Sequence, residues 1–132
     1  MKEFEANFIS LFCRPKRFEI RDKGILIHIE TSPLGHHLIV STLVFSENNC
    51  IPPSVRKCAK TNRFFEDQKF SPYLQVEEEA YYVYLRQKIP VLFPEQALGM
   101  VKKFIFLARF WAIFLKYFAK KDLQSLPKVS LV

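Results

Sequence analysis

The feature that most constrains this chain is an apolar run near its C-terminus, FIFLARFWAIFLKYFAKK at residues 104–121. Upstream, Pro94 suits the first turn of a helix because its missing N–H would have no partner there, and Glu95 complements the positive helix end. Lysines gather toward the far end of the run, where cations are favourable. These signals predict one long helix from about Pro94 to Leu123.

The charged residues within this run exclude a membrane-spanning helix. A span needs about 20 consecutive apolar residues. Here the longest uncharged stretch is Phe110–Leu115, which lies between Arg109 and Lys116. Because a charge at the centre of a bilayer costs several kcal/mol, we predict that the run does not cross a membrane.

The apolar arc of the predicted helix is wider than the arc that one sheet face usually covers. Lys102, Arg109 and Lys116 fall seven residues apart and form one charged stripe, while apolar side chains fill most of the remaining circumference. We predict that the core of the domain takes one side of the helix and that another chain or an exposed groove takes part of the other. The alternative is a helix sunk entirely in its own domain.

The composition indicates one folded domain with an anionic partner. A chain of 132 residues with 49% hydrophobic content is long and apolar enough for a single core. The 14 Phe indicate either a thick core or a surface kept for a partner. The net charge of +7 favours nucleic acid, acidic lipid or an acidic protein surface; the alternative is a basic surface that serves only solubility.

The first half of the chain reads as a helix followed by a three-stranded meander. Residues 4–13 space their apolar side chains at helical intervals, which predicts a short amphipathic helix. Alternating apolar residues then predict strands around turns at 22–24 and 33–35. The third strand, from His37 to Phe45, is apolar on both faces, as expected of a strand covered on each side.

The second half supplies a short helix, two more strands and the long helix. We expect the short helix from about Pro53 to Asn62, a strand around Tyr73 to Val76, and a fifth strand that ends at Pro90. In the fifth strand, Tyr81, Val83 and Leu85 are expected to share one face. The predicted fold class is α+β, with a five-stranded antiparallel sheet and the order α-β-β-β-α-β-β-α. Residues 1–123 form the single domain, and residues 124–132 are expected to be a flexible tail.

Motifs that carry chemistry are missing from the sequence. With three Gly, the chain has neither GxGxxG nor GxxxxGK[ST], and it has no GxSxG or HExxH. Cys13, Cys50 and Cys58 are odd in number and form no CxxC, so we read them as reduced thiols of a cytoplasmic protein. We predict that the protein is not an enzyme and uses no cofactor or metal.

A row of cations forms a predicted basic partner face on the long helix, and this face could neutralise phosphates or carboxylates. No nucleic-acid recognition motif accompanies it, and aromatics do not alternate with the cations on a strand face as a base-stacking sheet requires. Nucleic acid is therefore the weaker expectation. The face consists of Lys102, Lys103, Arg109, Lys116 and Lys120.

Three segments carry a resemblance to a known family. VRKCAKTNRFF looks like the second helix of the class I type III secretion chaperones, the small dimeric CesT/SycE-like proteins. YLQVEEEAYYVYLRQKIPV resembles their last two strands, and EQALGMVKKFIFLARFWAIFL their final helix with its late Trp111. The resemblance is strongest in residues 55–115. It implies a dimer that holds an extended segment of a secreted client protein, without ATP or cofactor.

The resemblance also assigns site residues by position. Client grooves would be lined by Phe4, Phe8, Phe12, Ile25 and Ile27. The subunit interface would contain Val55, Cys58, Phe64, Phe65 and Tyr82.

Two functions follow from these observations. The first is a secretion chaperone or co-chaperone, either a homodimer or a heterodimer with a second small chaperone. Members of the family are typically acidic, whereas this chain has a pI of about 9.4, and pairing with an acidic relative would reconcile the charge. The second is a basic regulatory adaptor that binds RNA polymerase or nucleic acid.

Overall fold

The computed structural model describes residues 17–32, 36–91 and 93–125. The predicted helix at 4–13, with Phe4, Phe8 and Phe12, lies outside these residues, as do the predicted turn at 33–35 and most of the predicted tail.

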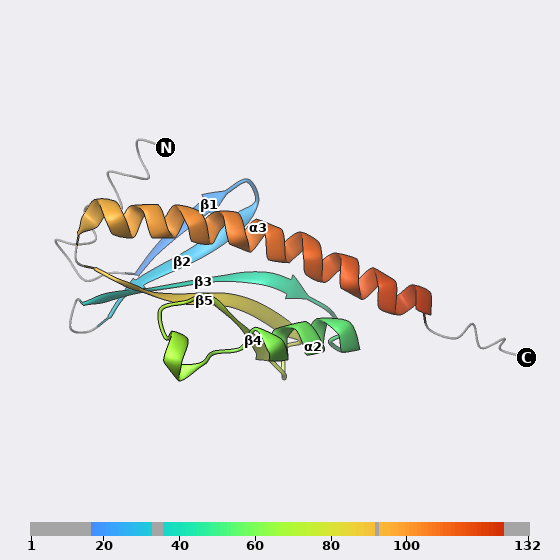
Figure 1. The fold of residues 1–132 in the computed structure, drawn as a ribbon. Helices are drawn as coiled ribbons and strands as arrows, with labels where there is room; N and C mark the ends of the chain where they lie inside the picture. Colours follow the sequence, from blue (N-terminus) through green and yellow to red (C-terminus); the bar gives the residue numbers. More distant parts are fainter. Residues whose placement is uncertain (1–16, 33–35, 92, 126–132) are drawn as a thin grey trace, which may run out of the picture.

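The described residues form an antiparallel sheet with two α-helices (Figure 1). The strand order across the sheet is β1-β2-β3-β5-β4. This confirms the α+β class and, from the first strand onward, the predicted element order. The elements are β1 (Arg17–Asp22), β2 (Ile25–Thr31), β3 (His37–Ser46), α2 (Pro53–Thr61), the 3-10 turn η1 (Glu66–Gln68), β4 (Tyr73–Glu77), β5 (Tyr82–Pro90) and α3 (Pro94–Ser125).

Two turns show how local sequence sets the sheet. Lys23 and Gly24 join β1 to β2 with φ values of 48° and 85°, the positive pair that a two-residue hairpin turn requires. Tyr81 also has a positive φ, 56°, and its carbonyl accepts the backbone N–H of Glu47 at 3.2 Å. The prediction that Tyr81 belongs to the fifth strand is therefore wrong, because this left-handed residue closes the turn before β5.

The core lies between one face of the sheet and the helices. Inward side chains alternate along β5, where Val83, Leu85 and Ile89 are buried, and α3 runs across the same sheet in contact with β3 and β5 (Figure 1). On α3, Phe104 and Leu115 are buried in this layer. The fold is thus a two-layer arrangement with α3 as the main cover.

The outer face of β3 corrects a prediction. Leu43 is exposed, so β3 is not covered on both sides over the described residues. The register shifts between Leu43 and Phe45, and this bulge lets the successive residues Val44 and Phe45 both be buried. The apolar sequence of the strand reflects the bulge at one end and an outer face on which Ile39 is half-buried and Leu43 exposed.

Side-chain contacts fix α3 to the other elements. Asp122 accepts the backbone N–H of Ser54 at 2.8 Å and also the Ser54 hydroxyl, which satisfies a free donor at the start of α2. Arg109 donates to Asp22 Oδ2 at 2.8 Å, at the end of β1. The middle and the far end of α3 are therefore both tied to residues distant in sequence.

Candidate protein-binding surfaces

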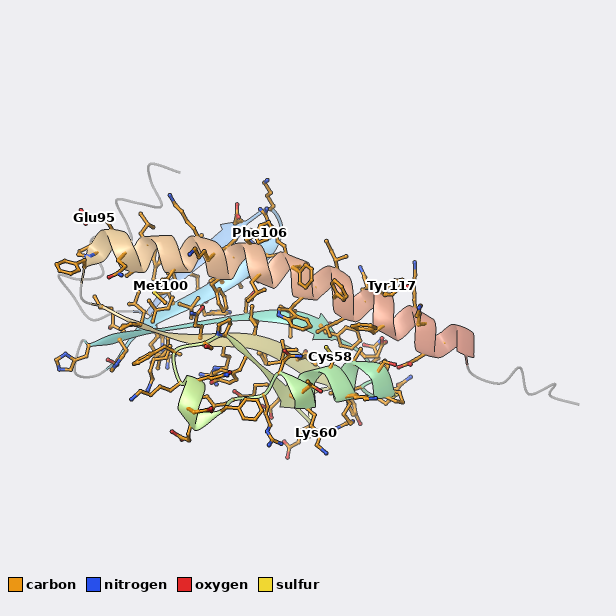
Figure 2. The ribbon with its side chains drawn as sticks, in the orientation of Figure 1. Cys58, Lys60, Glu95, Met100, Phe106 and Tyr117 are labelled. Atoms are coloured by element: carbon orange, nitrogen blue, oxygen red, sulfur yellow. The ribbon has the colours of Figure 1, made fainter. Side chains whose placement is uncertain are left out.

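The outward side of α3 carries an exposed apolar strip. Phe106 and Tyr117 lie on the side of the helix that faces away from the sheet (Figure 2). We call this surface the α3 strip; its members are Phe106, Phe110, Ile113, Phe114 and Tyr117, all exposed. The strip confirms that the core takes only one side of the helix. Within the part of the chain that the structure describes, α3 is therefore not buried on all sides.

Ring contacts connect the α3 strip to the half-buried side of the helix. The ring centroids of Phe110 and Phe114 are 4.4 Å apart. Trp111 lies edge-on to both rings, at 6.0 Å from Phe110 and 6.5 Å from Phe114. Aromatic pairs at these separations attract beyond simple area burial, so the strip is held in place by its own helix.

The predicted basic partner face is only partly available. Lys102, Lys103, Lys116 and Lys120 are exposed on α3. Arg109 is different: its guanidinium is about two-thirds buried and forms an ion pair with Asp22 at 2.8 Å. The inclusion of Arg109 in that face is therefore wrong, because the β1–β2 hairpin supplies its partner within the chain.

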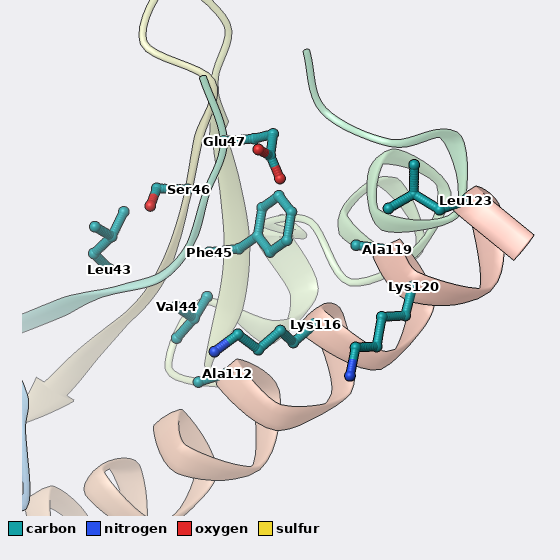
Figure 3. Close-up of a pocket in the computed structure, with 10 residues that line it drawn as sticks. All are labelled: Leu43, Val44, Phe45, Ser46, Glu47, Ala112, Lys116, Ala119, Lys120 and Leu123. Carbon is teal, nitrogen blue, oxygen red and sulfur yellow. The ribbon is translucent and has the colours of Figure 1, made fainter. Parts of the chain in front are cut away.

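A groove of about 410 Å³ lies between the end of β3 and the C-terminal half of α3 (Figure 3). Val44, Phe45 and Ala112 contribute apolar surface, and the side chains of Lys116 and Lys120 extend along the groove. Such a groove combines an apolar floor with two cations and one carboxylate, that of Glu47. It is suited to a chain segment that carries both apolar and acidic side chains.

A second groove, of about 620 Å³, lies between α2 and the edge strand β4. Phe64 and Tyr73 lie in edge contact at 5.2 Å in its wall. Three cations from α2 and the residues after it also line this groove: Arg56, Lys60 and Arg63.

Of the five predicted interface residues, Phe64 alone lines this groove. Phe64, Phe65 and Tyr82 are exposed and Cys58 is half-buried. Val55 has an exposed fraction of 0%, so the prediction that it contacts a second subunit is wrong. It packs in the core because it lies on the inward face of α2, where Ala59 is also buried.

The predicted client residues on the meander also require correction. Ile27 has an exposed fraction of 0% and pairs with Ile20 on β1 and Thr42 on β3. It cannot line an open groove, since this central strand is covered. Ile25 is half-buried, and Phe4, Phe8 and Phe12 lie outside the described residues.

An exposed ion pair borders the groove between α2 and β4. The Arg56 guanidinium donates to Glu78, in the turn before β5. This hydrogen bond lowers the pKa of Glu78 and raises that of Arg56. Because Glu78 titrates lower in the folded state, its small stabilising contribution is present above the ordinary carboxylate range and is lost as pH falls through the lowered pKa.

The two described thiols should differ in reactivity. Burial raises the pKa of Cys58, while a weaker hydrogen bond from Asn62 acts in the opposite direction; Cys50 is exposed. Because the thiolate is the reactive species, we expect iodoacetamide at pH 8 to alkylate Cys50 several-fold faster than Cys58, as followed by peptide mass spectrometry. In urea the two rates should converge. Equal rates in the folded protein would contradict the burial of Cys58.

Two chemical properties of the described residues bear on function. Among residues 17–32, 36–91 and 93–125, no three His, Cys, Asp or Glu side chains converge as a metal site would require. In the same part of the chain, even α3 lacks a stretch with the length and hydropathy of a membrane span.

Comparisons with known proteins define the fold. No family model matches the sequence, and no curated protein matches it. Among solved structures, a chain from the ExoT–SpcS complex of Pseudomonas aeruginosa, determined at 2.2 Å, matches with a TM-score of 0.52 and 16% identity. The match covers 80% of this chain and 93% of that chain. At this identity the similarity shows a shared fold.

Proposed function

We propose that this protein is a type III secretion chaperone or co-chaperone that binds a secreted client protein without ATP. The observation that carries the proposal is the fold, which matches a chain from a two-component complex over 80% of its length. The sequence resemblance to class I secretion chaperones supports the same function. A non-enzymatic binding protein needs accessible surface, and the exposed apolar residues on α3 and around β4 supply it.

A second small chaperone subunit is the proposed partner at the groove between α2 and β4. Phe64, which lines this groove, would provide an apolar contact, and the exposed Phe65 and Tyr82 would extend the contact beyond the groove lining. Lys60 and Arg63 line the same groove, and the chain has a net charge of +7. An acidic subunit would therefore meet less repulsion there than a second copy of this chain.

Client capture tests the proposal directly. The full chain, purified by affinity from cells that express its natural partners, is expected to retain a secreted protein whether or not ATP is present. Phe8→Asp, which places a charge in the predicted client-binding segment, should abolish that retention; a collapse of the melting transition would instead show that Phe8 is a core residue. Matched Phe93→Asp, at an exposed position before α3, should retain the client. Failure of the wild-type chain to retain any secreted protein would contradict the proposed function.

A basic adaptor is the second candidate, favoured by the exposed lysines of α3. Lys102, Lys103 and Lys116 are all exposed on this helix. For this function, the same purification would instead recover RNA polymerase subunits, or the chain would bind duplex DNA with an affinity that falls steeply with salt. A DNA affinity without salt dependence would exclude direct phosphate contact.

A further inference from the structure

Four residues of the α3 strip have the spacing of a coiled-coil seam. Phe106, Phe110, Ile113 and Tyr117 follow one another at intervals of four, three and four residues, which is the alternation of d and a positions in a heptad repeat. All four are exposed, and Ile113 reaches 71%. An aliphatic or aromatic side chain at every seam position is what a facing helix needs for knobs-into-holes packing.

We propose that this seam docks one amphipathic helix of another protein, with carboxylates on both sides of the apolar face of that helix. The proposal concerns a surface separate from the groove between α2 and β4, and it does not depend on the proposed function. The seam lies on the solvent side of α3, while Phe104 and Leu115 hold the opposite side of the helix in the core. The docking surface is therefore presented by a fixed helix.

The charges around the seam specify an acidic partner. Lys103 and Lys120 occupy the next seam positions beyond its two ends, and both are exposed. Lys116 falls at a flanking g position, a site whose charge selects partners in coiled coils. From Gln96 to Lys121 the sequence contains no Asp or Glu, so every charged side chain on this part of α3 is positive.

The same charges argue against a second copy of this chain at the seam. Parallel packing would place Lys103 opposite Lys103 and Lys120 opposite Lys120. Antiparallel packing would bring Lys103 of one copy toward Lys120 of the other. Like charges in direct opposition are destabilising, so the two copies would repel at both ends of a short apolar seam.

Two other occupants fit the surface less well. Residues 1–16 contain apolar side chains, but Lys2, Arg14 and Lys16 outnumber Glu3 and Glu5, so this segment carries little of the required negative charge. Helices that lie on a membrane present a broad apolar face, whereas the seam is the narrow stripe that matches one facing helix. The observations therefore favour an acidic helix.

The single Trp of the chain provides the readout. Trp111 contacts Phe110 and Phe114 of the α3 strip, so a docked helix should change its fluorescence. The probe is a synthetic three-heptad peptide with Leu at a and d and Glu at e and g; the control peptide carries Lys at e and g. We expect the Glu peptide to bind the full chain and to shift the fluorescence emission of Trp111 to the blue. The affinity of this peptide should fall as the salt concentration rises. The Lys peptide should bind at least tenfold more weakly.

A variant pair locates the binding to the seam. Ile113→Asp should reduce affinity for the Glu peptide at least tenfold with an unchanged melting temperature, because Ile113 is exposed. Phe93→Asp, at a side chain 64% exposed but outside the seam, should leave the affinity unchanged. Equal binding of both peptides, or no effect of Ile113→Asp, would overturn the proposal.

Three results would assign the seam to another occupant and so overturn the proposal. One is a Trp111 blue shift with phosphatidylserine vesicles but not with the Glu peptide. Another is tighter Glu-peptide binding by the full-length Phe8→Asp chain, which would show that residues 1–16 compete for the seam. The third is dissociation of a self-associated chain by Ile113→Asp in sedimentation velocity, which would show a second copy.

Discussion

Phe104→Ala is expected to lower the free energy of unfolding by about 3–5 kcal/mol, whereas Phe106→Ala should change it by no more than about 0.5 kcal/mol. The two residues are the same type and lie two positions apart on α3, yet Phe104 is 1% exposed and Phe106 is 73% exposed. Truncating Phe104 removes buried area and leaves a cavity between the helix and the sheet. Truncating Phe106 removes only surface that water already contacts.

Urea denaturation of the full chain measures both values. The Phe104→Ala midpoint should fall strongly with an unchanged slope, and the Phe106→Ala curve should overlay that of the wild type. The pair also separates effects on folding from effects on binding. Phe106→Ala should lower the affinity for the Glu peptide while the fold stays intact. A large destabilisation by Phe106→Ala would show that the α3 strip is covered within the chain and would contradict its role as an open surface.

Helix α3 was predictable because its signals are local. Pro94 and Glu95 mark its start, and the observed end at Ser125 lies two residues beyond the predicted one. The wide apolar arc also predicted that one side would remain outside the core. Which side is exposed depends on where the sheet lies, and for this reason the burial of Phe104 and the exposure of Phe106 required the structure.

The incorrect site predictions share a physical cause. Alternation along β2 places Ile25 and Ile27 on one face, but it does not tell whether that face is covered, and Ile27 proved buried. The prediction that Val55 contacts a second subunit was wrong for the same reason, because the helical pattern of α2 does not tell which face of the helix is covered. Arg109 was grouped with Lys102 and Lys116 by a spacing of seven, whereas its partner Asp22 is 87 residues away in sequence. Periodicity within one helix cannot predict an ion pair between residues that are distant in sequence.

For the coiled-coil seam, the spacing seen in the sequence was correct, and the structure showed which of the residues are exposed. The row of Lys102, Arg109 and Lys116 was visible in the sequence as a stripe of charge. Exposure of Phe106, Phe110, Ile113 and Tyr117 identifies that stripe as one flank of an apolar seam. The sequence supplied the spacing, and the structure determined which residues a partner can contact.

The combined variant Phe64→Asp/Tyr82→Asp should weaken subunit pairing by about 3–4 kcal/mol, a few hundred-fold in the dissociation constant. Phe64 packs edge-on against Tyr73 in the groove wall, and Tyr82 is exposed at the start of β5 in edge contact with Tyr84. Burying two carboxylates against a partner there would leave them desolvated and unpaired. Because both side chains are already exposed in the single chain, the same changes should affect its melting temperature little.

Sedimentation velocity over a range of concentrations measures the dissociation constant for the full chain, alone or with the small subunit that copurifies with it. Phe106→Asp is the control, since it adds a carboxylate to an exposed aromatic position on α3, away from the groove between α2 and β4. This variant should leave subunit pairing intact and lower the affinity for the Glu peptide. If Phe106→Asp disrupted pairing and the double variant did not, the subunit interface would lie on α3, because only there does a new charge meet the partner.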